Sequence, residues 1–390
     1  MKTNKIDFNL VFKNWRFPAF TIVELMIVIV IIAIVGGVAI SAFFMTYRSY
    51  RQSDDHITAA EEVEFAMAAL RPQFSNIGLG MPNNLEGQGS FNISFTGPDA
   101  DSQPIMAYMG DIKRVNTAWG GPITLGNGNA RNDLTSFVTE RNDEGVFAGR
   151  ELFYVWAVPT GVRLQRGSEW SKERTLFRSD IKDDVIEFKM LDRGDVRKLR
   201  DFTYDFDRQI GISNVNRGAN TRSWFLFPSF RIPLLVEGSS TQNAIDEASD
   251  TIQARVSPYS FYDHNTGHDA IFEGSIFGFE EVHLLQAACI FSNGDKLIQR
   301  TYGESIRDYT DRELASNVLG VYFVFNDVRR MLTMYTIARG NFKEEVPKAH
   351  NRFYLKSKLP EFAPAPEDLV SDADMGYRIL VESMTWRIRN

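Results

Sequence analysis

The densest group of possible metal ligands in the sequence lies between Asp263 and Asp269. Asp263, His264, His268 and Asp269 place two imidazoles and two carboxylates within seven residues. Zinc and other divalent ions use such groups. The spacing matches no established metal motif, and Asn265-Thr266-Gly267 indicates a turn. We therefore interpret the segment as a polar loop, with a weak metal site as the alternative.

Motifs for other chemistry are missing from the sequence. It contains no Gly-x-Ser-x-Gly elbow, no Gly-x4-Gly-Lys phosphate loop and no His-Glu-x-x-His helix. The single cysteine, Cys289, lies in an apolar run and is expected to be a buried small hydrophobe. We expect no enzymatic activity and no cofactor. A membrane-tethered enzyme whose site is assembled from distant residues is the alternative.

A lone acidic residue, Glu24, precedes an uncharged block of 21 residues from Leu25 to Met45. As a helix the block is about 31 Å long, which matches a hydrocarbon core of about 30 Å. Its Leu, Ile, Val and Phe residues contribute about 4 to 8 kcal/mol to membrane insertion. Glu24 near one end costs less than the 2.5 to 3.5 kcal/mol of a central charge, so insertion is favoured. A carboxylate in these surroundings is tolerated only if it is paired.

The residues before this block are basic. Lys2, Lys5, Lys13 and Arg16 outweigh Asp7, which gives a net charge of +3. Positive charge before the first apolar segment keeps that end cytoplasmic, so the chain after Met45 is expected to be translocated. A plain signal anchor is the alternative, and it leaves Glu24 without a role.

The stretch Pro18-Ala19-Phe20-Thr21-Ile22-Val23-Glu24, followed by the apolar block, resembles the precursors of type IV pilins. The resemblance implies that prepilin peptidase cuts between Ala19 and Phe20, that the new amine on Phe20 is methylated, and that Glu24 becomes the fifth residue of the mature chain. Glu24 would then pair with the Phe20 amine of a neighbouring subunit and set the register of assembly. The chain departs from the family in having Ala19 where most members have Gly.

The helix exit at 74–80 is similar to that of PilW-like minor pilins, which have large β-rich heads. The resemblance implies an α+β fold: a long N-terminal helix, transmembrane in its first half, packed on a large β-rich pilin-like head. The expected parts are a leader at 1–19, a transmembrane half-helix at 20–45, a soluble half-helix at 46–72 and a head at 73–390, which is long enough for one or two subdomains.

By the same resemblance, the chain is a minor pilin or pseudopilin that takes part in initiation or tip assembly of a type IV pilus. Its partners would be other pilins, prepilin peptidase and the assembly platform of the inner membrane. It would span that membrane once, with the head in the periplasm, before joining a cell-surface filament. The alternatives are a J-like minor pseudopilin of type II secretion and a membrane-tethered adhesin.

The soluble half of the helix shows one apolar face, formed by Ile57, Ala60, Val63, Met67 and Leu70. Pro72 is expected to end or kink the helix. The acidic residues Glu61, Glu62 and Glu64 are expected to face mostly outward.

Short runs of branched and aromatic residues dominate the rest of the chain. They predict strands at 152–158, 185–190, 224–227, 232–236, 282–291, 296–302, 321–325, 332–337 and 379–388. Asn293-Gly294 predicts a hairpin, and the polar residues after 325 predict a second one. Residues 363–368 read as an extended linker, and 83–145 as long surface loops.

The whole chain has a net charge of −7, and removal of the +3 leader leaves −10. No basic run is interleaved with aromatic residues, so nucleic-acid binding is not expected.

Overall fold

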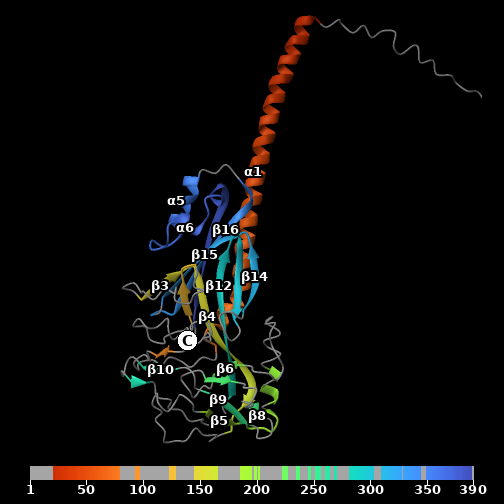
Figure 1. The fold of residues 1–390 in the computed structure, drawn as a ribbon. Coiled ribbons are helices and arrows are strands. Elements are labelled where there is room, and N and C mark those ends of the chain that lie inside the picture. Colours follow the sequence, from red (N-terminus) through yellow and green to blue (C-terminus); the bar gives the residue numbers. More distant parts are fainter. Residues whose placement is uncertain are drawn as a thin grey trace, which may run out of the picture. The chain divides into compact units, whose positions relative to one another are not determined.

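The computed structural model describes residues 21–79, 93–96, 123–128, 145–165, 185–195, 197–199, 201–202, 222–226, 234–237, 245–246, 251–255, 260–263, 268–269, 281–302, 309–326, 328–343 and 348–388. Contacts within the chain divide it into two compact units, 1–54 and 55–390. The long helix α1 (Ile22–Asn76) contributes residues to both. The described fold is a long apolar helix and a β-rich region of antiparallel sheets, in agreement with an α+β class (Figure 1).

Helix α1 continues past the point at which we expected it to end. Pro72 lies inside it, and the helix ends at Asn76. Proline removes one backbone hydrogen bond from a helix interior. The last turn is nevertheless held by packing, because Leu70 and Phe74 on either side of the proline are buried. Tertiary burial therefore outweighs the local penalty.

The buried face of α1 differs from the predicted one at its start. Ile57 is 55% exposed and is not part of the core. The residues that do face the core share helical spacing and are Asp55, Ala59, Val63, Ala66, Met67, Leu70 and Phe74. The prediction was correct for Val63, Met67 and Leu70, and wrong for Ile57.

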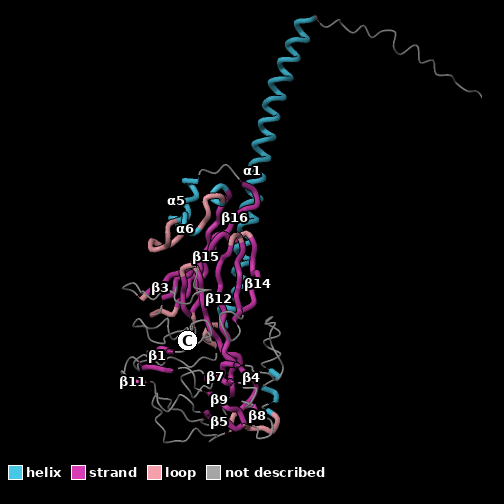
Figure 2. The backbone as a smooth tube through the Cα atoms, in the orientation of Figure 1, coloured by secondary structure: helices cyan, strands magenta, loops and turns pink. Residues whose placement is uncertain are grey.

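Within the part of the chain that the structure describes, the strands form three antiparallel sheets. Figure 2 draws these strands in magenta. Their bounds are β1 (Ile93–Thr96), β2 (Ile123–Gly126), β3 (Val146–Gly149), β4 (Glu151–Arg163), β5 (Val185–Lys189), β6 (Arg222–Leu226), β7 (Leu234–Glu237), β8 (Ile245–Asp246), β9 (Thr251–Arg255), β10 (Ser260–Asp263), β11 (His268–Asp269), β12 (Glu281–Asn293), β13 (Lys296–Tyr302), β14 (Tyr309–Ser316), β15 (Val318–Asn326), β16 (Met331–Lys343) and β17 (Tyr377–Arg387).

The largest sheet has ten strands, with the path β14-β13-β12-β6-β7-β9-β5. Strand β4 pairs with β12 and with β2, and β8 pairs with β9. The second sheet has four strands in the order β17-β16-β15-β3, and the third joins β1, β10 and β11.

Both predicted hairpins are confirmed. Strands β12 and β13 pair up to Asn293 and Lys296, so Gly294 and Asp295 form the turn, one residue later than expected. Strands β15 and β16 pair from Val318 to Asn326, and the predicted last strand is β17, paired with β16.

Strand β4 was expected to end at Pro159, but it continues to Arg163. The reason is an irregularity in its pairing with β12, where the register shifts between Glu281 and His283. Pro159 pairs at this point, and Gly161 has a φ of 75°. Bulges accept proline and left-handed glycine, which a regular central strand does not.

Two further segments differ from the expectation. The expected linker at 363–368 contains the start of a one-turn helix, α6 (Pro366–Leu369), with Pro366 in its first turn. A longer helix, α5 (Lys348–Lys358), precedes it, and a 3-10 turn, η5 (Asp374–Gly376), follows it. The expected loop region 83–145 contains β1 and β2.

The core of the unit 55–390 contains two large clusters of buried residues, and strand β15 contributes to both. A small third cluster joins Val63 and Met67 of α1 to Ala338 of β16. Val321 and Phe323 belong to the larger cluster. It also contains Ala66, Leu70 and Phe74 of α1, Ile77 just after the helix, and residues of β2, β4, β12, β13 and β14. Leu319 and Tyr322 belong to a second cluster with α5, α6 and β17. The four-stranded sheet is thus covered on both faces.

Candidate assembly site

The start of α1 is closed by a reciprocal pair of side-chain contacts. Oε2 of Glu24 accepts hydrogen bonds from the backbone N–H and the hydroxyl of Thr21, both at 3.0 Å. In return, the backbone N–H of Glu24 donates to Oγ1 of Thr21 at 3.2 Å. This is a capping box, in which two otherwise unpaired helix donors are satisfied.

Glu24 therefore has a local role that the sequence interpretation did not include. The Thr-x-x-Glu spacing was visible in the sequence, where we read it only as part of a processing motif. Ala19 and Phe20, the expected cleavage site, lie outside the described residues.

The residues that follow present an apolar surface without a covering. From Leu25 to Met45 every residue is exposed except Gly36, which is half-buried. The run of six β-branched residues from Ile27 to Ile32 is helical, although β-branched residues favour strands in water. In both length and composition this part of α1 suffices to cross a membrane.

Aromatic and basic residues lie at the end of the apolar block and just beyond it. The rings of Phe43 and Tyr47 stack with their centroids 6.4 Å apart. The guanidinium of Arg51 lies 5.8 Å from the centroid of Tyr47. Tyr and Arg are typical of the layer in which a membrane segment meets water.

In the unit 55–390, α1 is fixed first by a buried carboxylate. Asp55 is 1% exposed, and its Oδ1 accepts a hydrogen bond from the backbone N–H of Phe342 at 3.1 Å. Phe342 lies in β16 where the register with β17 shifts between Arg339 and Lys343. The helix also touches the strand here, because a Cβ at Gly340 would lie 2.9 Å from the Cβ of Asp55. Glycine is needed at this close approach.

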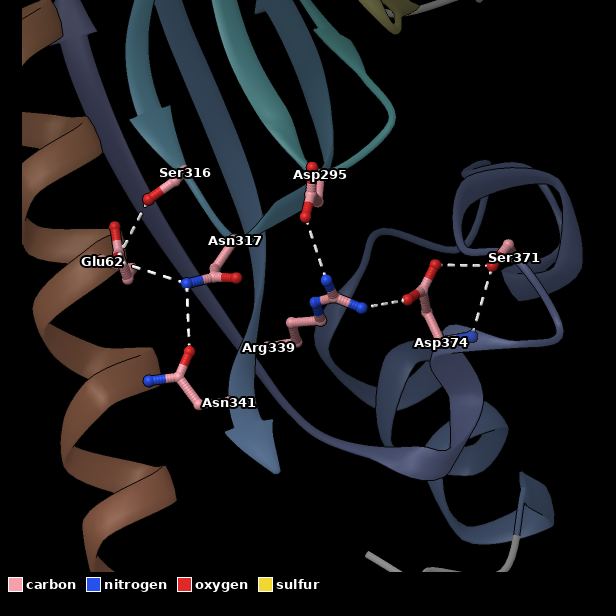
Figure 3. A network of polar contacts seen from close by, with 8 residues as sticks. All are labelled: Glu62, Asp295, Ser316, Asn317, Arg339, Asn341, Ser371 and Asp374. Carbon is pink, nitrogen blue, oxygen red and sulfur yellow. Dashed lines mark hydrogen bonds and ion pairs between the residues drawn. The ribbon is translucent and has the colours of Figure 1, made fainter. Parts of the chain in front are cut away.

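A second polar contact lies two turns further along the helix, where Figure 3 shows Glu62 facing the ends of two strands. Its Oε1 accepts hydrogen bonds from Ser316 at 3.3 Å and from Nδ2 of Asn317 at 3.4 Å. Asn317 is the single residue between β14 and β15, and its φ is 53°. Its Nδ2 also donates a hydrogen bond to Oδ1 of Asn341. Glu62 is half-buried, so the expectation that it faces outward was wrong.

The same figure shows a second polar group around Arg339 of β16. Its guanidinium contacts Asp295 of the β12–β13 turn at 2.9 Å and Asp374 at 2.5 Å. Asp374 in turn accepts a hydrogen bond from Ser371. Arg339 thus joins a turn of the ten-stranded sheet to the chain before β17.

The end of α1 is fixed by two consecutive side-chain hydrogen bonds that meet at Tyr154. The hydroxyl of Tyr154 donates to Oε1 of Gln73 at 3.5 Å and accepts from Nε2 of Gln299 at 2.8 Å. Burial raises the pKa of the Tyr154 phenol well above its usual range, although the bond from Gln299 acts in the opposite direction. Apolar packing surrounds these groups, including Phe74 against Trp386 with ring centroids 4.3 Å apart.

The predicted polar segment at 263–269 is only partly described. Asp263 ends β10, His268 and Asp269 form β11, and the backbones of Asp263 and His268 pair directly. His264 lies outside the described residues. Within the described residues, no three His, Cys, Asp or Glu side chains form a group that could hold a metal ion. Cys289 is buried, as expected.

Comparison with known proteins adds no assignment: no protein-family model, no curated protein and no solved structure matches this chain. The features that bear on function are therefore the capped apolar helix and its continuation into the β-rich unit.

Proposed function

We propose that this protein is a minor pilin or pseudopilin of a type IV pilus machine, acting in filament initiation or tip assembly. In this proposal prepilin peptidase removes residues 1–19, and the amine of Phe20 is methylated. The subunit spans the inner membrane once, with its head in the periplasm, and interacts with the assembly platform. It then leaves the membrane and packs among other pilins.

The observation that carries the proposal is the capped start of a fully exposed apolar helix. The carboxylate of Glu24 makes membrane insertion of this segment less favourable, so its presence calls for a role other than insertion. Its Oε2 is occupied by Thr21, and within residues 21–79 its Oε1 makes no hydrogen bond. That oxygen is free to pair with the Phe20 amine of a neighbour. Such a pair offsets the desolvation of both charges.

A second support is the continuity of α1. The same helix that carries the apolar surface is anchored in the β-rich unit from Asp55 to Phe74. A filament subunit needs a rod for packing and a head that stays attached to it when the rod leaves the lipid. Here the anchoring contacts come from three strands that are far apart in sequence, through Phe342, Ser316 and Tyr154.

Substitutions at the capping box separate its two possible roles. Glu24→Gln keeps the capping geometry, since glutamine serves in capping boxes, but removes the charge. Thr21→Ala removes the box and keeps the charge. If the intermolecular pair directs assembly, Glu24→Gln should abolish incorporation into filaments as completely as Glu24→Ala, while Thr21→Ala assembles.

The readout is the amount of this subunit in sheared filaments, compared with the amount in the membrane. If the Glu24→Gln subunit entered filaments at the parental level, the role of Glu24 would be limited to capping the helix. The main support for the proposal would then be lost. Mass spectrometry of the native N-terminus tests processing separately. A chain that still begins at Met1 in cells with active prepilin peptidase would exclude a pilin.

A further inference from the structure

A basic and aromatic surface surrounds α5, and the proposed function gives it no role. We define the α5 surface as Phe342, Lys343, Lys348, Phe353 and Lys356. Helix α5 contains four Lys or Arg residues and no Asp or Glu. Phe353 is 74% exposed and Phe342 40%, and the three lysines are exposed as well.

The α5 surface lies at one particular end of the unit 55–390. Nδ2 of Asn351 on α5 donates to the backbone oxygen of Tyr377 at 2.8 Å, and Tyr377 pairs with Lys343 at the end of β16. The neighbouring Phe342 binds Asp55, the first residue of the unit. Figure 1 shows α5 and the end of β16 at the same end of this unit. The α5 surface is therefore close to the point where the chain arrives from the apolar segment.

Chain length limits how far this end can be from the apolar block. Asp55 follows Met45 by ten residues, which as helix amounts to about 15 Å. If residues 25–45 cross a bilayer, Asp55 and the groups around it lie within that length of the hydrocarbon boundary. Lipid headgroups occupy the first part of this distance.

The charges of the α5 surface are partly paired inside the unit. Lys348 contacts Asp372 at 2.5 Å, and Arg352 contacts Glu367 at 3.0 Å. Within the described residues, Lys343 and Lys356 form no ion pair. Residues 342–358 carry five Lys or Arg against Glu344 and Glu345, and counting the partner acids Asp372 and Glu367 as well leaves a net charge of +1 in a chain of −7. The charge is thus opposite in sign to that of the protein and complementary to an anionic surface.

We propose that the α5 surface binds anionic phospholipid headgroups while the subunit is anchored in the membrane. Lysines next to a negatively charged bilayer each contribute about a five-fold preference for the bound state. An exposed phenylalanine between them inserts into the headgroup boundary, as in helices that lie on membranes. The contact holds the β-rich unit against the bilayer before assembly. It rests on the membrane span of the proposed function and not on filament formation.

The test uses the full chain in nanodiscs of phosphatidylcholine, with or without phosphatidylglycerol. A single cysteine replaces Ser357, on the exposed side of α5, and carries an environment-sensitive fluorophore. Cys289 is fully buried and does not compete for labelling in the folded protein. A matched probe replaces Val328, which is 80% exposed in the turn at the other end of the β15–β16 hairpin. Quenching by headgroup-labelled lipid reports contact with the bilayer.

We expect quenching at position 357, but not at 328, to rise about five-fold or more when phosphatidylglycerol is present. High salt should reverse the rise, because exposed charges are screened. The variant Phe353→Ser with Lys356→Glu should abolish it. The control Val328→Ser with Arg329→Glu likewise replaces an exposed apolar residue by serine and an exposed cation by glutamate, at the opposite end, and should leave the rise intact.

Equal quenching at the two positions, or no response to phosphatidylglycerol, would overturn the lipid contact while leaving the pilin proposal untouched. A rise that persists in the Phe353→Ser, Lys356→Glu variant would also overturn it. A chain that does not enter nanodiscs at all would refute the membrane span and both proposals with it. Circular dichroism and the thermal midpoint confirm that the variants fold.

Discussion

The two parts of helix α1 have the same backbone geometry for opposite reasons. From Leu25 to Met45 the side chains are apolar and exposed. No contact within the described residues offsets the free-energy cost of exposing them to water. From Asp55 to Phe74 one face is buried under strands, while the other carries exposed residues such as Ile57 and Phe65. The first part needs an external apolar environment, and the second is stabilised by the fold itself. The comparison teaches that helix length alone says nothing of what stabilises it.

The largest expected effect comes from placing charges in the exposed apolar part. Val30→Arg together with Ile34→Arg should cost about 5 to 7 kcal/mol of insertion free energy, comparable to the whole gain of the block. The double variant should be recovered in the soluble fraction after alkaline extraction of membranes. Arginines at Ile57 and Phe65, in the packed part, should leave recovery in the membrane unchanged. Retention of the Val30, Ile34 variant in the membrane would show that another segment anchors the chain.

The next effect concerns the packed part. Phe74 is 2% exposed, and Phe74→Ala should lower the free energy of unfolding by about 3 to 5 kcal/mol, because it leaves a cavity next to Trp386. Phe65→Ala removes the same ring from a site that is 59% exposed and should change stability by less than about 0.5 kcal/mol. Denaturant unfolding followed by tryptophan fluorescence measures both. Similar losses for the two variants would contradict the packing of α1.

A smaller effect is expected at Asp55, where the packed part begins. Asp55→Ala removes the partly buried hydrogen bond from the backbone N–H of Phe342 and should cost about 1 to 3 kcal/mol. Gly340→Ala should have a comparable cost, since its Cβ would overlap Asp55. Asp55→Asn keeps an acceptor and should cost less than Asp55→Ala. Hydrogen exchange at the Phe342 amide should accelerate in the alanine variant, and unchanged exchange would argue against the contact.

The last prediction concerns the response of the unit 55–390 to alkaline pH. Burial raises the pKa of Tyr322 to about 12, whereas a tyrosine in the unfolded chain titrates near 10. Above pH 10 the unfolded state loses its proton first, so stability that is complete below pH 10 falls until about pH 12. The slope is about 1.4 kcal/mol per pH unit for each such tyrosine. Tyr322→Phe should reduce this slope by about 1.4 kcal/mol per pH unit. A flat profile in the parent protein would contradict the burial of these phenols.

The elements that the sequence predicted best are those with strong local signals. The β12–β13 and β15–β16 hairpins and the strand β17 follow from alternating apolar runs and from Asn293-Gly294. The predictions failed where long-range packing decides the local structure. Helix α1 passes through Pro72 because Phe74 is buried, and β4 passes through Pro159 because a bulge against β12 accepts it.

The candidate site divides in the same way. Glu24 could be singled out from its position before an apolar block, and its capping partner Thr21 from the spacing of three. Asp55, Glu62 and Asn317 could not, because their partners are 254 to 287 residues away or depend on the αL conformation of a single connecting residue.

By itself, the sequence determined the apolar helix, its capped acidic start and the strand-rich composition of the remaining chain, because these depend on residue type and on spacings of two to four. The tertiary structure alone decided which face of α1 is buried, where the helix ends, and how Arg339, Glu62 and Asp55 join distant strands. Those outcomes depend on contacts between residues far apart in the chain. The free energies of these contacts equal or exceed the local conformational preferences that the contacts override.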